Sequence, residues 1–357
     1  MAHSEDVVVV ANGAVLAGLA LASPADFIRE SAPRGAYTAG RAEFGKGMGW
    51  WSAHLARLRR SLRAMRERDP GCFELGSEIP ADDDTLATWV APSVKLALDA
   101  IDAKTLANAK PCDAVKPPKQ AKQHCVVIIV APAPSGYDVF VHASPLQIRV
   151  DEFYRGVDVA VLGPPRRNPA AKDTNWVRDR RQLEARKREA AADEVILADD
   201  DGEVLLEGLV TNLFVVVETE DPGGGHLPRR HAAFTAPTTR CLPGLARQAV
   251  LDALDAEGIP WEERAPTASE RSEWSEAFVT NAVKLARPVR TLRWPRGIPG
   301  KLEVEFGPCA GSGEKPRGDS EWKSEVKCEL DASPGPVCQA VLRRLNASMA
   351  SDVGPAR

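Results

Sequence analysis

The chain has 357 residues, which is long enough for two domains and a substantial core. Apolar residues make up 44% and charged residues 27%, as is usual for a soluble globular protein. The formal net charge of −4 argues against a general affinity for nucleic acid or anionic membrane surfaces. The longest apolar run, around Val126–Ala131, is far too short to span a bilayer.

The N-terminus and the cysteines indicate the compartment. The first ten residues, MAHSEDVVVV, have no basic segment before an apolar one, so we expect no secretory signal. The seven cysteines are scattered, with no C-x-x-C pair and no spacing typical of metal ligands. We therefore expect reduced thiols, a cytoplasmic location and no bound metal.

The first part of the chain predicts a small α/β unit. In chain order we expect strands at 7–16 and 35–44, helices at 51–68 and 82–101, and paired strands at 125–133 and 137–143. The helix at 51–68 places its apolar residues three or four apart, and Pro92 predicts a break or kink in the next one. The Lys- and Pro-rich residues 104–122 indicate an exposed loop.

The second part predicts a mixed sheet. We expect strands at 157–162, 213–217, 232–235, 276–280 and 288–292, a hairpin turn at 201–202, a Gly-rich turn at 222–225, and helices at 174–192 and within 241–258. Residues 300–333 are irregular and polar, and a short helix at 337–345 closes the chain. This pattern predicts an α+β fold with a small α/β domain at 1–148, a larger mixed β domain at 149–299 and an irregular C-terminal segment at 300–357.

The segment LLEGLVTNLFVVVE, residues 205–218, predicts a buried strand that nevertheless contains Glu207 and Asn212. A buried carboxylate is costly unless a charged or hydrogen-bonding group meets it. The alternative is a glutamate exposed at the surface just past a hairpin. We expect a partner for Glu207.

Several motifs follow one another in a recognisable order. They are R-G-A-Y-T-A-G-R at 34–41, S-A-H-L-A-R-L at 52–58, A-A-K at 170–172, E-G-x-x-T-N-L-F at 207–214, L-P-G-L-A-R at 242–247 and F-V-T-N-A-V-x-x-x-R-P-V at 278–289. This order resembles the fold-type IV pyridoxal-phosphate enzymes, which include branched-chain aminotransferases, D-amino acid aminotransferases and aminodeoxychorismate lyase. The resemblance covers roughly residues 33–293 and implies the two-domain fold of that family, with pyridoxal 5'-phosphate as cofactor.

The resemblance implies the roles of two residues. Lys172 would be the Schiff-base lysine, and because an amine must be neutral to attack an aldehyde, burial or the nearby Arg166 and Arg167 should lower its pKa. Glu207 would pair with the pyridine nitrogen of the cofactor and keep the ring protonated as an electron sink. Taken alone, Lys172 is one lysine among many, and a solvated loop lysine is the better interpretation.

The resemblance also implies a phosphate site. Arg57 matches the phosphate arginine of the H-x-x-R-L pattern, although on its own it could be a solvated helix arginine. Free backbone N–H groups at a helix start, here Leu245 and Ala246, bind anions. The predicted cofactor-binding residues are Arg57, Glu207, Asn212, Leu245, Ala246, Thr280 and Asn281, and the candidate substrate contacts are Tyr37, Thr38 and Arg41.

The leading hypothesis for the reaction is amino-group transfer between an amino acid, of branched-chain or D-amino acid type, and a 2-oxo acid. Alternatives are a lyase that releases pyruvate from aminodeoxychorismate, towards which Thr280-Asn281-Ala282 leans, and a catalytically silent cofactor-binding protein. The family tyrosine after the lysine is missing, and Trp176 stands nearby. The resemblance implies a homodimer, and we expect no nucleic-acid or membrane partner.

Overall fold

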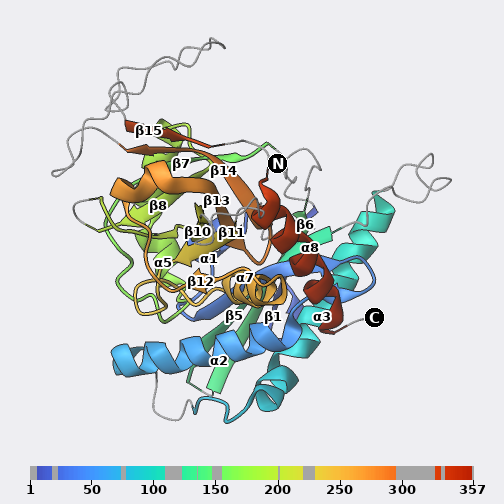
Figure 1. The fold of residues 1–357 in the computed structure, drawn as a ribbon. Helices are drawn as coiled ribbons and strands as arrows, with labels where there is room; N and C mark the ends of the chain where they lie inside the picture. The colour runs from blue at the N-terminus through green and yellow to red at the C-terminus, as the bar shows by residue number, and fades with distance from the viewer. Residues whose placement is uncertain are drawn as a thin grey trace.

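Two β-sheets with helices packed on them form the frame of the molecule (Figure 1). The computed structural model describes residues 6–17, 23–73, 78–108, 123–134, 136–146, 155–199, 202–219, 230–294, 326–330 and 334–355. No helix within these ranges combines the length and apolar character that crossing a membrane requires. The parts of the sequence analysis that concern 109–122, the turn at 222–225 and most of 300–333 lie outside the described residues.

The first sheet has the strand order β2-β1-β6-β5-β3-β4. Its elements are β1 (Val8–Ala11), β2 (Ala14–Val15), α1 (Pro24–Glu30), β3 (Ala36–Glu43), β4 (Gly47–Met48), α2 (Trp51–Arg68), a 3-10 turn (Pro70–Cys72), α3 (Asp83–Ala107), β5 (Gln123–Ala133) and β6 (Gly136–Leu146). The helix predicted at 51–68 is confirmed as α2, and its apolar stripe is buried against the sheet. Pro92 does not break α3, because Val90 and Val94 on either side are fully buried and their packing outweighs one missing backbone hydrogen bond.

The second sheet has the order β12-β11-β10-β13-β14-β7-β8-β9, with β15 beside β14. Its elements are β7 (Val157–Val161), α5 (Asn175–Asp179), α6 (Arg181–Glu189), β8 (Glu194–Ala198), β9 (Leu205–Gly208), β10 (Asn212–Thr219), β11 (Arg230–Thr235), α7 (Leu245–Ala256), β12 (Trp261–Glu262), a 3-10 helix (Ala268–Glu273), β13 (Trp274–Asn281), β14 (Leu285–Trp294), β15 (Val326–Glu329) and α8 (Pro336–Ser351). An added β9–β10 pairing closes six of these strands into a ring with an apolar interior, while α7 and α8 cover the outside.

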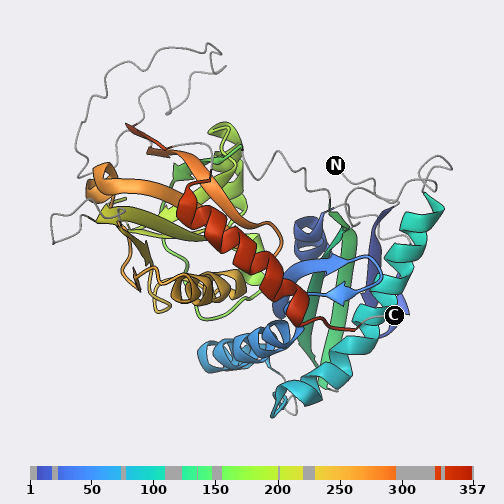
Figure 2. The same ribbon diagram turned by 45° about the vertical axis from the view of Figure 1, so that its right-hand side comes forward.

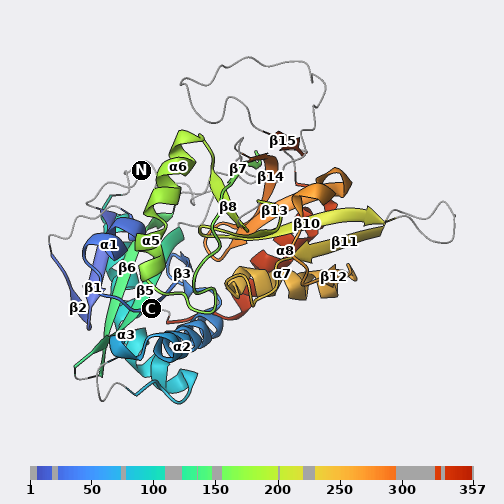
Figure 3. The ribbon, with the colours of Figure 1, turned by 90° about the vertical axis from the view of Figure 1, so that its left-hand side faces the viewer.

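The two sheets lie side by side, with α8 running from the second towards the first (Figure 2). In the view of Figure 3, α5 and α6 lie between them. The predicted α+β fold is confirmed, since both sheets carry helices on their faces. The first sheet ends at Leu146 and the second begins at Val157. The predicted domain boundary at residue 148 falls within 147–154, outside the described residues, and stays a prediction.

The structure corrects the sequence analysis where strands and helices are interrupted. Residues 7–16 form a hairpin, because Asn12 and Gly13 take positive φ angles of 47° and 77° between β1 and β2. The helix expected at 174–192 is two helices, α5 and α6, separated at Arg180. The irregular C-terminal segment contributes strand β15 to the second sheet, and its closing helix is longer than predicted. A four-residue strand with two charged residues, VKCE, gives too weak a pattern to predict.

The most consequential correction concerns residues 205–218. They form two antiparallel strands, β9 and β10, joined by a tight turn at 209–211, rather than one strand. The turn closes with a 2.7 Å hydrogen bond from the Gly208 N–H to the Thr211 carbonyl. Glu207 and Asn212 are thereby paired directly opposite each other across the ladder.

Candidate active site

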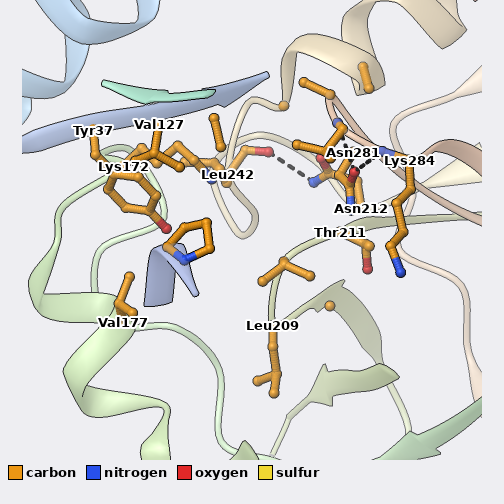
Figure 4. Close-up of a pocket in the computed structure, with 18 of the residues that line it drawn as sticks. Tyr37, Val127, Lys172, Val177, Leu209, Thr211, Asn212, Leu242, Asn281 and Lys284 are labelled. Atoms are coloured by element: carbon orange, nitrogen blue, oxygen red, sulfur yellow. Dashed lines mark hydrogen bonds between the residues drawn. The ribbon is translucent and has the colours of Figure 1, made fainter. Parts of the chain in front are cut away.

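A cavity of about 400 Å³ lies between the two sheets (Figure 4). Its walls come from the loop before α5, the β9–β10 turn, the start of α7, the β13–β14 turn, strands β3 and β5, and helix α1. The sequence-predicted residues that line it are Tyr37, Arg57, Lys172, Glu207, Asn212, Leu245, Ala246, Thr280 and Asn281. Residues from distant parts of the chain therefore line one cavity.

Glu207 and Asn212 hold the backbone of one residue, Leu242, in the opposite loop. The Leu242 N–H donates to Glu207 Oε2 at 3.1 Å, and Asn212 Nδ2 donates to the Leu242 carbonyl at 2.9 Å. Glu207 Oε1 is buried and has no hydrogen-bond partner among the described residues. Burial raises the pKa of Glu207, and the positive charge of Arg166 opposes this rise. Glu207 thus has one oxygen engaged in structure and one left for a donor in the cavity.

The β9–β10 turn is held by side chains from elsewhere in the chain. The Leu209 carbonyl accepts from Trp176 Nε1 at 3.0 Å and from Arg180 Nη1 at 3.1 Å. On the other side, Thr211 Oγ1 donates to the buried Glu194 at 3.0 Å. The Trp176 N–H, which could in principle serve a ligand, is therefore used to hold this turn.

Lys172 lies over the ring of Tyr37, with its Nζ 4.7 Å from the ring centroid (Figure 4). Its backbone is fixed on both sides, since its N–H donates to Ser61 Oγ at 3.1 Å and its carbonyl accepts from the Tyr37 N–H at 2.8 Å. Burial lowers the pKa of Lys172 well below its usual value, and the charges of Arg57, Arg166 and Arg180 lower it further. An amine whose pKa is lowered is more often in its neutral, nucleophilic form.

Helix α7 starts at the cavity without a side-chain cap from the described residues. Its N-cap Gly244 supplies no side chain to the first turn, so the N–H groups of Leu245 and Ala246 have no capping side chain. A Cβ at Gly244 would lie 2.1 Å from Asn212 Oδ1, so only glycine allows this close approach. The positive end of the helix dipole favours an anion at this point.

Two further donors surround the start of α7. Arg57, buried on α2, donates from Nη2 to the Pro243 carbonyl at 3.1 Å, while its Nε has no partner among the described residues. Thr280 Oγ1 is likewise buried and unpartnered within the part of the chain that the structure describes. Burial lowers the pKa of Arg57, so a bound anion would favour its charged form. Together these groups make a site for a phosphate-like anion.

Three predicted residues serve the frame of the site. Thr38 Oγ1 lies 2.6 Å from His54 Nδ1 in the core, and Arg41 donates from Nε and Nη2 to the Val283 carbonyl at 3.0 and 2.7 Å. Neither Thr38 nor Arg41 lines the cavity, so their placement does not support substrate contact. Asn281 does line it, but its Oδ1 accepts from the backbone N–H groups of residues 283 and 284 and so shapes the β13–β14 turn (Figure 4).

One side of the cavity is apolar, and sequence reasoning missed it. Its apolar wall consists of Pro24, Ala25, Ile28, Val127, Val177 and Leu209. The first three come from α1, which is anchored by hydrogen bonds from Arg178 to the carbonyls of Ile28 and Ala32. The Ser23-Pro24 start of α1 is a recognisable helix-start signal, yet it says nothing about the cavity.

The charged environment was predicted only in part. Arg166 lines the cavity and lowers the pKa of Lys172, as expected, whereas Arg167 lies in a separate outer pocket. Arg180, which the sequence analysis did not single out, also lines the cavity. Across the described ranges, no three His, Cys, Asp or Glu side chains are grouped so that they could hold a metal ion.

The chain is similar to known proteins in sequence pattern and in fold. A family model described as amino-transferase class IV matches residues 35–292. No curated protein sequence matches the chain significantly. Helices α1 and α8 lie outside the range that the family model matches.

Three solved structures are similar in fold. A hypothetical aminotransferase from Mycobacterium tuberculosis in its PLP-bound form has 18% identity and a TM-score of 0.59, covering 96% of this chain and 99% of that one. The branched-chain amino acid aminotransferase of Escherichia coli has 17% identity and a TM-score of 0.57, covering 98% and 95%. That of Thermoproteus uzoniensis, solved with norvaline, has 18% identity and a TM-score of 0.57, covering 96% and 95%.

Proposed function

The chain belongs to the class IV aminotransferase family, and from this premise we propose that it is an aminotransferase dependent on pyridoxal 5'-phosphate. It moves an amino group between an amino acid with an apolar side chain and a 2-oxo acid. The observation that carries the proposal is a set of buried polar atoms without hydrogen-bond partners among the described residues, on side chains that line one cavity together with a lysine whose pKa is lowered.

The residues present fit the cofactor. Lys172 would hold it covalently through Nζ, and Glu207 Oε1, which has no partner among the described residues, would accept a hydrogen bond from its ring nitrogen. Its phosphate would be held by Arg57, the hydroxyl of Thr280 and the free N–H groups at the start of α7. When bound, pyridoxal phosphate supplies an aldehyde that bonds amines and a ring that accepts electrons from the substrate α-carbon.

The protein's own groups then divide the work of proton transfer. The lowered pKa of Lys172 would suit its Nζ to take a proton from one carbon and return it to another. The buried carboxylate of Glu207 keeps a proton at the ring nitrogen. The ring of Tyr37 covers Lys172 and limits the access of water to Nζ.

The apolar wall supports the choice of substrate. An amino acid side chain directed at Ile28, Val127 and Val177 would replace water against aliphatic surface and gain about 25 cal/mol for each Å² that it buries. A side-chain carboxylate there would lose its hydration, and Arg180, which also lines the cavity, is already engaged by Glu184 and the Leu209 carbonyl. We therefore propose substrates of the branched-chain type over acidic ones.

The test is a half-reaction. With an apolar amino acid and no acceptor, the loaded enzyme should release at most one equivalent of 2-oxo acid per chain, and adding a different 2-oxo acid should start continuous turnover. Aspartate should react far more slowly, and each amino acid is assayed as both enantiomers. Continuous release of pyruvate from aminodeoxychorismate without any acceptor would establish the lyase instead, and no product from either would indicate a silent cofactor-binding protein.

Two expectations stay predictions. The homodimer and the cytoplasmic location follow from the family resemblance and from the composition. The oligomeric state is measured by light scattering at two protein concentrations.

A further inference from the structure

The C-terminal helix α8 is attached at its start to the strand that carries Thr280. The backbone N–H groups of Val337 and Cys338 donate to the two carboxylate oxygens of Glu276 on β13, both at 3.0 Å. Further along, the apolar side of α8 packs with α7 in one buried cluster. The first half of α8 is therefore fixed to the two elements that form one side of the anion site.

The other end of α8 reaches the beginning of α2 (Figure 2). We call residues 348–355 the C-terminal strap. Asp352 accepts three hydrogen bonds there: its carbonyl from the Trp51 N–H at 3.2 Å, its Oδ2 from the Ser52 N–H at 3.0 Å and its Oδ1 from the Ser52 hydroxyl at 3.1 Å. Beside it, the Gly354 N–H donates to the Met48 carbonyl at 2.8 Å.

These contacts replace a helix cap that α2 lacks. Its N-cap residue, Trp50, is in the left-handed conformation with φ 56° and makes no side-chain hydrogen bond to the first turn. The first N–H groups of a helix need acceptors from outside, and a carboxylate is the preferred one because the helix dipole is positive at that end. Asp352 supplies this carboxylate from 300 residues further along the chain.

The helix that receives this cap carries the groups that build the site. Arg57 lies in the second turn of α2 and already contacts the Pro243 carbonyl, immediately before the start of α7. One turn later, Ser61 accepts the hydrogen bond from the Lys172 N–H. A shift or fraying of the start of α2 would therefore move Arg57 relative to α7.

We propose that Asp352 is a positioning residue for the cofactor phosphate. Helix α8 ties β13 and α7, which form one side of the anion site, to α2, which carries Arg57 on the other. Residues 334–355 lie outside the range that the family model matches. The inference rests on the proposed function only in requiring that pyridoxal phosphate binds the cavity.

The test compares two ligands that differ only in the phosphate. The dissociation constants of pyridoxal phosphate and pyridoxal are measured by titrating the full-length, cofactor-free protein. Asp352→Ala should weaken pyridoxal phosphate about fivefold to tenfold, the size of a lost helix cap, and change pyridoxal less than about twofold. Asp352→Asn keeps one acceptor oxygen and should restore part of the loss.

Two further variants separate positioning from general destabilisation. Asp82→Ala removes the equivalent cap from α3, where Asp82 Oδ1 accepts a 2.7 Å hydrogen bond from the Thr85 N–H. Asp82 does not line the cavity, so this variant should leave both affinities unchanged. Gly354→Ala should act like Asp352→Ala, because a Cβ there would lie 2.3 Å from the Trp51 ring and displace the strap.

Each outcome either supports or overturns the proposed role of Asp352. Equal weakening of both ligands by Asp352→Ala, or an effect of Asp82→Ala as large, would overturn the positioning role. Unchanged binding of pyridoxal phosphate by Asp352→Ala and Gly354→Ala would do the same. If the unaltered protein binds no pyridoxal phosphate, both the proposed function and this inference are wrong. If the enzyme transaminates normally and the variants keep unaltered affinities, only the inference is wrong.

Discussion

The cavity has a polar end and an apolar end, and the two differ in how their side chains are satisfied. At the polar end, Glu207, Arg57 and Thr280 are buried with polar atoms that lack partners within the described residues, and the pKa of Lys172 is lowered. At the apolar end, Ile28 and Val177 pack into an apolar cluster that needs no hydrogen-bond partner.

This difference separates binding from folding. A buried polar group without a partner costs the fold about 1–3 kcal/mol, and that cost is recovered only when a ligand supplies the partner. Buried aliphatic groups stabilise the fold whether or not a ligand is present. Substitutions at the polar end should therefore abolish function without lowering the stability of the cofactor-free protein. Those at the apolar end should lower stability and change only the choice of substrate.

The largest effect is expected for Lys172→Met. Transamination should fall on the order of 10⁴-fold or more, because Lys172 would both hold the cofactor covalently and transfer the proton. The rate of oxo-acid formation measures this loss. In the unaltered enzyme, borohydride reduction followed by peptide mass spectrometry should find the cofactor on Lys172, and finding it on another lysine would refute the assignment.

The same variant tests the stability side of the comparison. In the unfolded chain a lysine is protonated below its ordinary pKa of 10.5, whereas burial lowers the pKa of Lys172 in the folded protein. Folding therefore disfavours the protonated amine, which costs stability below pH 10.5, and this cost disappears as pH rises to 10.5. Cofactor-free Lys172→Met should unfold at a higher temperature than the unaltered protein, with the gap narrowing towards pH 10.5. Lys284→Met, at an exposed lysine of the same cavity, should show no such pH-dependent gap.

A smaller loss is expected for Glu207→Gln. The amide can still accept from the Leu242 N–H, so the fold and cofactor binding should persist. Without the negative charge the ring nitrogen is no longer kept protonated, and kcat should fall about 10²- to 10³-fold, as for loss of one preorganised electrostatic group. Glu194→Gln is the matched control, since this buried carboxylate accepts the hydrogen bond from Thr211 that holds the β9–β10 turn but does not line the cavity. Equal losses in both variants would mean that Glu207 acts only through the turn.

The polar end could be predicted from the sequence because its groups lie in short motifs. The A-A-K and E-G-x-x-T-N motifs identify Lys172, Glu207 and Asn212 from the residues next to them in the sequence. What the sequence could not supply is their relation in space. Residues 209–211 contain no glycine or proline to announce a turn, and their turn depends on Glu194, Trp176 and Arg180 from elsewhere in the chain.

Strand geometry explains a second shortfall. Successive side chains of β3 point to opposite faces, so Tyr37 and Ala39 line the cavity while Thr38 turns into the core towards His54. This alternation was available from the sequence and would have removed Thr38 from the substrate contacts. The position of α1 at the cavity could not be predicted from the sequence, because it depends on hydrogen bonds from Arg178 to two distant backbone carbonyls.

The smallest effect is expected at the apolar end, from Ile28→Val. Removing one methylene group from the wall enlarges the cavity slightly. The kcat/KM ratio should therefore shift about threefold to tenfold in favour of an amino acid one methylene longer. The ratio for two such substrates is the measurement, because it cancels any change in the amount of folded enzyme. The fold should lose about 1 kcal/mol, as for other buried Ile→Val changes.

Ile101→Val provides the comparison for that last change. Ile101 is fully buried on α3 and does not line the cavity, so its variant should lose similar stability and leave the substrate ratio unchanged. If both variants shift the ratio equally, general loosening of the fold is responsible and α1 is not part of the substrate site. If Ile28→Val alone shifts it, the apolar wall selects the side chain while the polar end performs the chemistry.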